Sequence, residues 1–222
     1  MYTISVVAEK GGVGKTTLAL TLAVAAVQAG RKVAVFDLDP QATAAQWTDR
    51  RDNEFPWVVA TPATRLDAAM ANARTQGVDF VVIDTPPHAG TDAVEAARRS
   101  DLVLVPVEPH LYTLETLPKL GNLLKLAGGA PALFVVSKAA IQGKEAQDAA
   151  AFIAEQGFAV CPVTLHLRAA HRHAGNLGQT AQEYEPKGKA AEESIQVYMY
   201  TMQLLTRKGT SHAEAEPAIA RA

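Results

Sequence analysis

The stretch that decides the fold is Glu9-Lys10-Gly11-Gly12-Val13-Gly14-Lys15-Thr16-Thr17, which follows an apolar run at residues 3–7 and leads into a helical pattern. Its glycines allow successive backbone N–H groups to point at phosphate oxygens, in conformations that a β-carbon would obstruct. The helix that follows adds the positive end of its dipole. The stretch therefore predicts a phosphate-binding loop.

Within this loop the side chains have separable roles. Lys15 is expected to neutralise the β- and γ-phosphates of a nucleotide, and the Thr16 hydroxyl to ligate the Mg²⁺ that bridges them. Thr17 is expected to support the nucleotide from the start of the helix. A plain tight turn or a dinucleotide-binding turn would not need Lys-Thr after the last glycine, and Thr17 stands where the last glycine of G-x-G-x-x-G would fall. Both alternatives are disfavoured.

Short apolar runs alternate with segments of helical period outward from the loop, which is typical of βαβ units. Strands are expected at 3–7, 32–36, 57–60, 80–83, 102–105, 132–136 and 159–163. Helices are expected at 16–29, 41–51, 64–76, 91–99, 112–127, 143–156 and 187–207, several closed by a glycine. The fold class is α/β, a doubly wound, mostly parallel β-sheet flanked by helices, as in P-loop NTPases.

Length and composition suit one globular domain. The 222 residues, 48% hydrophobic and 20% charged, predict a single domain at 1–208 and a flexible tail at 209–222. No apolar run approaches the roughly 20 residues that span a bilayer, so we expect a cytoplasmic protein with no membrane partner. The net charge of −2 does not fit a constitutive nucleic-acid binder. Cys161, the single cysteine, is expected in the core.

Acidic residues follow two of the predicted strands. Asp37 and Asp39 end the second, where both are expected to face the phosphates; the alternative for Asp39 is the cap of a helix starting near Pro40. Asp84 ends the fourth strand, in the Walker B position, and is expected to hold Mg²⁺ through water. After the sixth strand, Ser137-Lys138-Ala139-Ala140 lacks the aspartate that recognises guanine, which favours adenine.

Three segments together resemble the ParA/MinD family of ATPases, the deviant Walker A type of P-loop protein. They are K-G-G-V-G-K-T at 10–16, with Glu9 where the usual motif has its first glycine, D-L-D-P-Q at 37–41 and D-T-P-P at 84–87. The resemblance implies ATP and Mg²⁺ as cofactors. It also implies a loop after Asp84 that senses the γ-phosphate, and a base pocket around Leu167 and Arg168.

The same resemblance implies a dimer. In the family the first lysine of the loop reaches the partner's ATP, a role that falls here on Lys10 and would place positive charge at the transition state. Asp39 would position the attacking water and lie in the outer shell of the Mg²⁺. The implied catalytic residues are therefore Lys10, Lys15 and Asp39.

The C-terminal third matches the family more loosely, at Y-E-P-K-G-K-A in 184–190. In partition ATPases the basic residues of this region form a DNA-binding patch in the ATP dimer, and phosphate contacts with counterion release allow an acidic protein to bind DNA. The candidates are Arg168, Arg172, Lys187, Lys189, Arg207 and Lys208, and solvated surface charge is the alternative for each. His171 and His173 could contribute. The last helix is expected to pack on the sheet through Ile195, Tyr198, Met202 and Leu205.

The resemblance implies a ParA-like ATPase that dimerises on ATP, binds DNA non-specifically and positions a plasmid, chromosome or other cargo. Its weak hydrolysis would be stimulated by a ParB-like centromere-binding or cargo-adaptor protein, and it would be nucleoid-associated. A MinD-like, membrane-associated positioning ATPase is the alternative, disfavoured because the tail lacks a bulky apolar face. A biosynthetic or iron–sulfur reductase relative is a third possibility, and the single cysteine argues against a bridging cluster.

Overall fold

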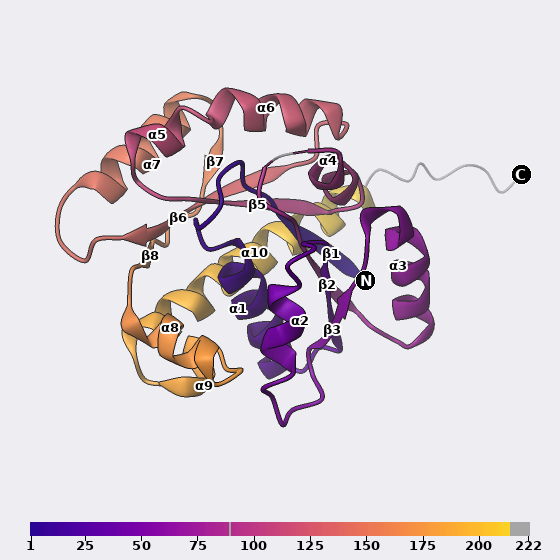
Figure 1. Ribbon diagram of the computed structural model, residues 1–222. Coiled ribbons are helices and arrows are strands. Elements are labelled where there is room, and N and C mark those ends of the chain that lie inside the picture. The colour runs from indigo at the N-terminus through magenta and orange to yellow at the C-terminus, as the bar shows by residue number, and fades with distance from the viewer. Residues whose placement is uncertain (89, 214–222) are drawn as a thin grey trace, which may run out of the picture.

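The chain forms an eight-stranded parallel sheet with helices on both faces (Figure 1). The computed structural model describes residues 1–88 and 90–213, without the side chains of residues 111, 112 and 208–213. The strands run in the order β3-β2-β4-β1-β5-β6-β7, and β8 pairs with the far end of β6. Their bounds are β1 Tyr2–Val6, β2 Val33–Asp37, β3 Trp57–Ala60, β4 Phe80–Asp84, β5 Leu102–Val107, β6 Ala132–Ala139, β7 Ala159–Val160 and β8 Leu165–His166.

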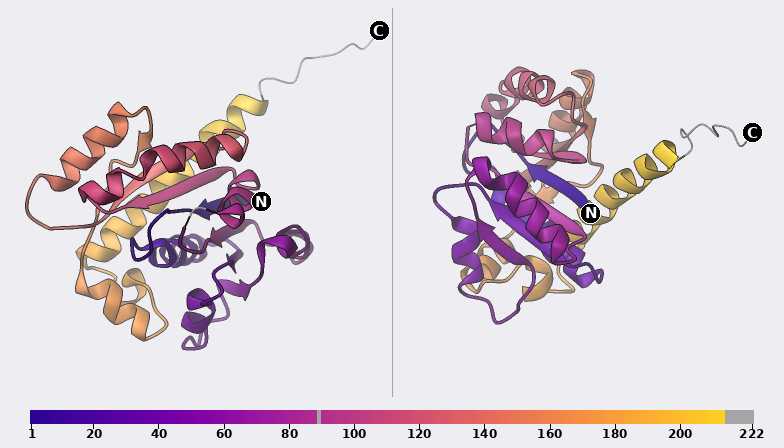
Figure 2. Two further views of the ribbon diagram at one scale, coloured as in Figure 1. Left: turned by 45° about the horizontal axis from the view of Figure 1, so that its top comes forward. Right: turned by 90° about the vertical axis from the view of Figure 1, so that its right-hand side faces the viewer.

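The helices form two layers around the sheet (Figures 1 and 2). Their bounds are α1 Lys15–Gln28, α2 Thr43–Thr48, α3 Leu66–Thr75, α4 Thr91–Arg98, α5 Leu111–Leu114, α6 Leu117–Leu126, α7 Glu145–Glu155, α8 Ala169–Asn176, α9 Ala181–Tyr184 and α10 Lys189–Ala213, with a 3₁₀ turn at Ala63–Arg65. Helices α1 and α10 pack on one face of the sheet, and α3, α4, α6 and α7 on the other. This confirms the predicted fold class.

The parallel register aligns the strand ends from which the site is built. Val6 at the end of β1 pairs with Asp84, and Asp84 pairs with Asp37 on the other side. Because these neighbouring strands are parallel, the loops that follow β1, β2 and β4 meet at one edge of the sheet. Ligands of such sheets bind at this edge, outside the carboxyl ends of the strands. None of the helices in the described part of the chain is both long and apolar enough to span a bilayer.

Several predicted elements need correction. The strand expected at 159–163 ends at Val160, and the helix expected at 112–127 is broken, because Pro118 in the first turn of α6 favours a new helix start. The helix expected at 41–51 begins only at Thr43, since Ala42 is left-handed, with φ 51°. Strand β8 and helices α8 and α9 were not expected.

The last helix packs on the sheet as predicted, since Tyr198 and Leu205 are in the core and Met202 is partly buried against it. Val197, Tyr198 and Leu205 are buried, whereas Ile195 is 37% exposed, so its assignment to the core was wrong. Buried Ser194 and Thr201 complete the stripe and donate to backbone carbonyls four residues earlier. Because these two buried residues are polar, a count of apolar positions did not reveal the full buried face of α10. Helix α10 also continues past residue 208, and residues 214–222 of the expected tail lie outside the described residues.

Candidate nucleotide-binding site

The phosphate loop joins β1 to α1 and depends on left-handed glycines. Gly12 and Gly14 have φ values of 83° and 95°, a region that favours glycine, and α1 begins directly afterwards with no side-chain cap. The N–H groups of its first turn are therefore not satisfied by a capping side chain, as an anion site requires. A cavity of about 260 Å³ lies over the loop and is lined by Gly11, Gly12, Gly14, Lys15, Thr16, Thr17, Asp39, Pro87 and Lys138.

Lys15 and Asp84 are charged groups held largely out of water. Lys15 is 7% exposed, and burial lowers its pKa against the opposing effect of Asp84 and Asp39. Burial raises the pKa of Asp84 to about 7, although the Thr16 hydroxyl and Lys15 act in the other direction. Among the described residues, neither carboxylate oxygen of Asp84 meets a hydrogen-bond partner in good geometry. A buried carboxylate of this kind next to a threonine hydroxyl fits a Mg²⁺ site, since oxygen ligands suit that cation.

The two aspartates after β2 differ in orientation. Asp37 accepts hydrogen bonds from the backbone N–H groups of Asp39 at 3.0 Å, Ala44 at 2.9 Å and Ala45 at 3.3 Å. Its carboxylate therefore holds the loop and the start of α2, and the expectation that it faces the phosphates was wrong. Asp39 accepts from the N–H of Gln41 at 2.9 Å and lines the phosphate cavity. It does not cap α2, which starts after Ala42.

The loop after β4 is attached to the phosphate loop. Thr85 donates its hydroxyl to the Val6 carbonyl at 2.8 Å, and the N–H of His88 donates to the Glu9 carbonyl at 3.2 Å. Pro87 lines the phosphate cavity. The loop after β4 is thus held by one hydrogen bond to the end of β1 and by one to the start of the phosphate loop.

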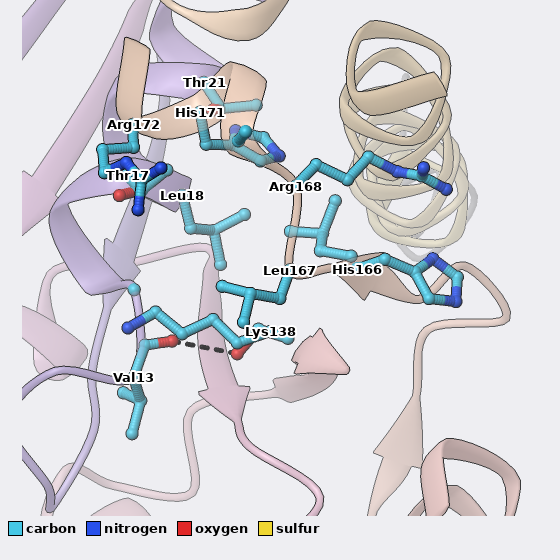
Figure 3. Close-up of a pocket in the computed structure, with 14 residues that line it drawn as sticks. Val13, Thr17, Leu18, Thr21, Lys138, His166, Leu167, Arg168, His171 and Arg172 are labelled. Atoms are coloured by element: carbon cyan, nitrogen blue, oxygen red, sulfur yellow. Dashed lines mark hydrogen bonds between the residues drawn. The ribbon is translucent and has the colours of Figure 1, made fainter. Parts of the chain in front are cut away.

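A second cavity, of about 400 Å³, continues from the loop toward β8 and α8 (Figure 3). Its lining includes the predicted base residues Leu167 and Arg168, together with Leu18, Ser137, Lys138 and His171. The Arg168 guanidinium points toward α10, where it contacts Glu193 at 2.6 Å; His166 Nδ1 lies 2.8 Å from the same carboxylate. Arg168 therefore borders this cavity with its charge compensated.

His171 and Lys138 line this cavity but were not among the residues predicted to bind the nucleotide. Burial lowers the pKa of His171, and within the described residues its Nε2 atom is buried with no hydrogen-bond partner. A neutral imidazole in this position can exchange a hydrogen bond with a ligand. No sequence motif marks His171, whereas Lys138 follows a strand in the segment read for base recognition.

The segment that follows α2 is bound to α9 by a buried ion pair. Arg51 contacts Glu183 at 2.7 Å and donates to the Gly178 carbonyl at 2.7 Å, and its guanidinium lies 4.3 Å from the centre of the Trp47 ring. The Arg51 side chain is only 3% exposed. This contact joins residues 132 positions apart and holds α9 against the segment that follows α2.

The basic residues proposed for DNA binding do not form one cluster. Arg172 and Lys187 are exposed, and Lys189 pairs with Glu192 at 2.7 Å. Arg207 is exposed on the same helix as Lys189 but about 27 Å further along it, at 1.5 Å per residue. The side chain of Lys208 lies outside those that the structure describes.

A protein-family model and several known proteins match the sequence of this chain. The family model described as the CobQ/CobB/MinD/ParA nucleotide binding domain matches residues 4–208. Over 207 residues the chain is 28% identical to maintenance of carboxysome distribution protein A of Gloeobacter kilaueensis, covering 92% of this chain and 94% of that protein. It is 28% identical over 163 residues to the sporulation initiation inhibitor protein Soj of Bacillus subtilis, covering 55% of this chain and 64% of Soj, which is less than two thirds of that relative's length.

Solved structures show the same fold. The MinD cell division protein of Aquifex aeolicus matches with a TM-score of 0.74 and 16% identity, covering 91% of this chain and 98% of that one. The septum site-determining protein MinD of Pyrococcus horikoshii, complexed with Mg-ADP, matches with a TM-score of 0.71 and 21% identity over 91% of this chain and 96% of that one.

Proposed function

Because the chain belongs to the CobQ/CobB/MinD/ParA nucleotide-binding family, we propose that it is a ParA-like ATPase that dimerises on ATP and positions a cargo on DNA. The observation that carries this proposal is the phosphate loop with two lysines, Lys10 and Lys15, beside the carboxylates of Asp39 and Asp84. A P-loop that only binds a nucleotide needs the second lysine alone.

The residues of one subunit account for binding and for positioning of water. Lys15 places a buried positive charge at the cavity where the β- and γ-phosphates bind, and Asp39 lines the same cavity and can hold the attacking water in line. Thr16 and Asp84 would hold Mg²⁺, Asp84 through water, and bound Mg²⁺ would neutralise charge on the phosphates. The Asp84 carboxylate must be ionised for this.

Lys10 is the residue that requires a second subunit. It starts the phosphate loop and is half-buried, and in the family the equivalent lysine reaches the ATP of the partner. We assign it the same role, in which it adds positive charge to the transition state from across the dimer interface. Dimerisation and hydrolysis then both depend on Lys10. A partner protein that acts on the dimer interface would therefore affect both.

Support for DNA and cargo comes from the relatives and from the basic residues. A relative matched over nearly its whole length is named for carboxysome distribution, and others are named as chromosome partitioning proteins. Arg172 lies on α8, Lys187 in the turn before α10 and Lys189 at the start of α10, and Arg207 and Lys208 lie further along α10. A dimer would double these charges and strengthen phosphate contacts. We propose a nucleoid-associated protein and a ParB-like adaptor that stimulates hydrolysis.

The test combines light scattering with DNA sedimentation. With ATP and Mg²⁺ the protein should form a dimer that sediments with DNA of any sequence, and with ADP it should stay monomeric. Lys15→Ala should lower ATP affinity about 100-fold through the loss of a charge-assisted contact. Lys10→Ala should bind ATP within a few-fold of the original protein but lose dimerisation or hydrolysis.

Lys125→Ala serves as the control, because Lys125 is an exposed lysine on α6, away from the site. Full dimerisation and hydrolysis by Lys10→Ala would contradict the proposal that Lys10 acts across an ATP-dependent dimer interface. ATP-dependent binding to anionic liposomes without any binding to DNA would replace this proposal with membrane-associated positioning.

A further inference from the structure

The end of β6 is irregular where it passes the phosphate loop. The pairing of β6 with β8 shifts register between Ser137 and Ala139, and Lys138, the residue between them, has a left-handed backbone with φ 52°. A non-glycine residue in this region is uncommon and persists where its surroundings fix it. The irregularity turns two successive polar side chains of β6, Ser137 and Lys138, to the phosphate loop.

These two side chains bind two successive carbonyls of the loop. The Ser137 hydroxyl donates to the carbonyl of Val13 at 2.9 Å, shown as the dashed line in Figure 3, and the Lys138 ammonium donates to the carbonyl of Gly12. Ser137 is 4% exposed, so its hydrogen bond is protected from water. The Lys138 bond is charge-assisted, and bonds of this kind are about twice as strong as neutral ones.

The geometry of the peptide group determines how these contacts orient the N–H groups of the loop. In a trans peptide the C=O of one residue and the N–H of the next point in opposite directions. A Gly12 carbonyl held by Lys138 therefore aims the N–H of Val13 away from β6, and a Val13 carbonyl held by Ser137 does the same for the N–H of Gly14. Backbone N–H groups of such a loop are its phosphate ligands, so their orientation decides the affinity.

We infer that Ser137 and Lys138 are positioning residues that preset the phosphate loop for the nucleotide, an inference that rests on the proposed function. Lys138 also lines both the phosphate cavity and the cavity beside β8, so it lies where a bound nucleotide would extend from one cavity into the other. Glu108, just beyond β5, lies 3.4 Å from the Lys138 ammonium and balances its charge. A surface ion pair with Glu108 alone would contribute little; the carbonyl contact gives Lys138 its role.

The test measures the loop directly and then its ligand. Lys138→Met keeps the length of the stem and removes the donor, Lys138→Arg keeps a donor, and Ser137→Ala removes the other contact. Hydrogen exchange in the nucleotide-free protein should become faster across residues 10–17 in Lys138→Met and Ser137→Ala. Mg-ADP affinity should fall about tenfold in Lys138→Met and recover in Lys138→Arg, because a hydrogen bond to a charged group contributes about a factor of ten or more. In Ser137→Ala it should fall about fivefold, because the lost hydrogen bond is neutral.

Lys125→Met, a loss of an exposed lysine elsewhere, should change neither quantity. A merely structural role for Lys138 would lower the melting temperature without selective exchange in the loop, and this result would overturn the inference. Unchanged exchange and affinity in Lys138→Met and Ser137→Ala would overturn it too. Failure of the original protein to bind ATP at all would instead refute the proposed function, so the two failures are distinguishable.

Discussion

The two ends of the nucleotide site are built in different ways. The phosphate end consists of loops that directly follow β1, β2 and β4, and its Asp84 is a buried carboxylate with a pKa raised to about 7. The base end brings β8, α8 and α9 against α2 and α10, and its charges are matched in the pairs Arg51–Glu183 and Arg168–Glu193. At the phosphate end, the buried charge of Asp84 can be compensated by a bound cation. At the base end, the charged side chains already compensate one another in ion pairs.

The largest expected effect of a single substitution on stability at one pH comes from breaking the base end. Arg51→Ala should lower the free energy of unfolding by about 3 kcal/mol, because it leaves the Glu183 carboxylate without its buried partner. Urea denaturation would measure the loss. Arg98→Ala, which removes an exposed pair with Glu95, is the matched control and should cost at most about 1 kcal/mol. Equal losses in the two variants would show that the base end does not depend on its buried ion pair.

A pH titration of stability examines the phosphate end. In the unfolded chain Asp84 releases its proton near pH 4, whereas in the folded protein its pKa is raised to about 7, mainly by burial. Between these values the folded state holds a proton that the unfolded state has lost. The contribution of Asp84 to stability therefore falls as pH rises from about 4 to 7, by up to about 1.4 kcal/mol per pH unit, and is constant above.

Asp84→Asn isolates this contribution. The difference in unfolding free energy between the original protein and Asp84→Asn, measured in urea from pH 5 to 8 without nucleotide, should shift in favour of the variant up to about pH 7. Mg²⁺ should stabilise only the original protein, and more strongly at pH 8 than at pH 6, because the ionised carboxylate is the ligand. Parallel pH profiles would mean that Asp84 is not perturbed.

The smallest expected effect concerns the exposed wall of the base end. Leu167 lines the cavity beside β8 and is 66% exposed, so Leu167→Ala should leave stability within about 0.5 kcal/mol. ATP affinity should fall about threefold, through lost apolar contact with the base. Fluorescent-nucleotide titration would measure it, and Leu177→Ala, another exposed leucine that lines none of the described cavities, is the control. A loss as large as that of Lys15→Ala would mean that the base, rather than the phosphates, dominates binding.

Sequence reasoning was reliable where the determinant is local. Glycine spacing, the Lys-Thr pair and an aspartate at a strand end each act within a few residues, and the alternation of strands and helices placed them at one edge of the sheet. It failed for Asp37, since a carboxylate after a strand looks the same whether it meets a ligand or the backbone N–H groups of Ala44 and Ala45. It failed for Ile195, since Ser194 and Thr201 occupy the buried stripe of α10.

By itself the sequence determined the fold class, the phosphate loop and the carboxylates around it, because backbone conformation and strand ends are set by nearby residues. Only the tertiary structure decided which carboxylate is buried with no well-aligned hydrogen-bond partner among the described residues, and which arginine is already paired with Glu193. It also decided that Ser137 and Lys138 hold the carbonyls of a loop 124 and 126 residues away. These properties depend on desolvation and on contacts between distant segments, and both arise only when the sheet has assembled.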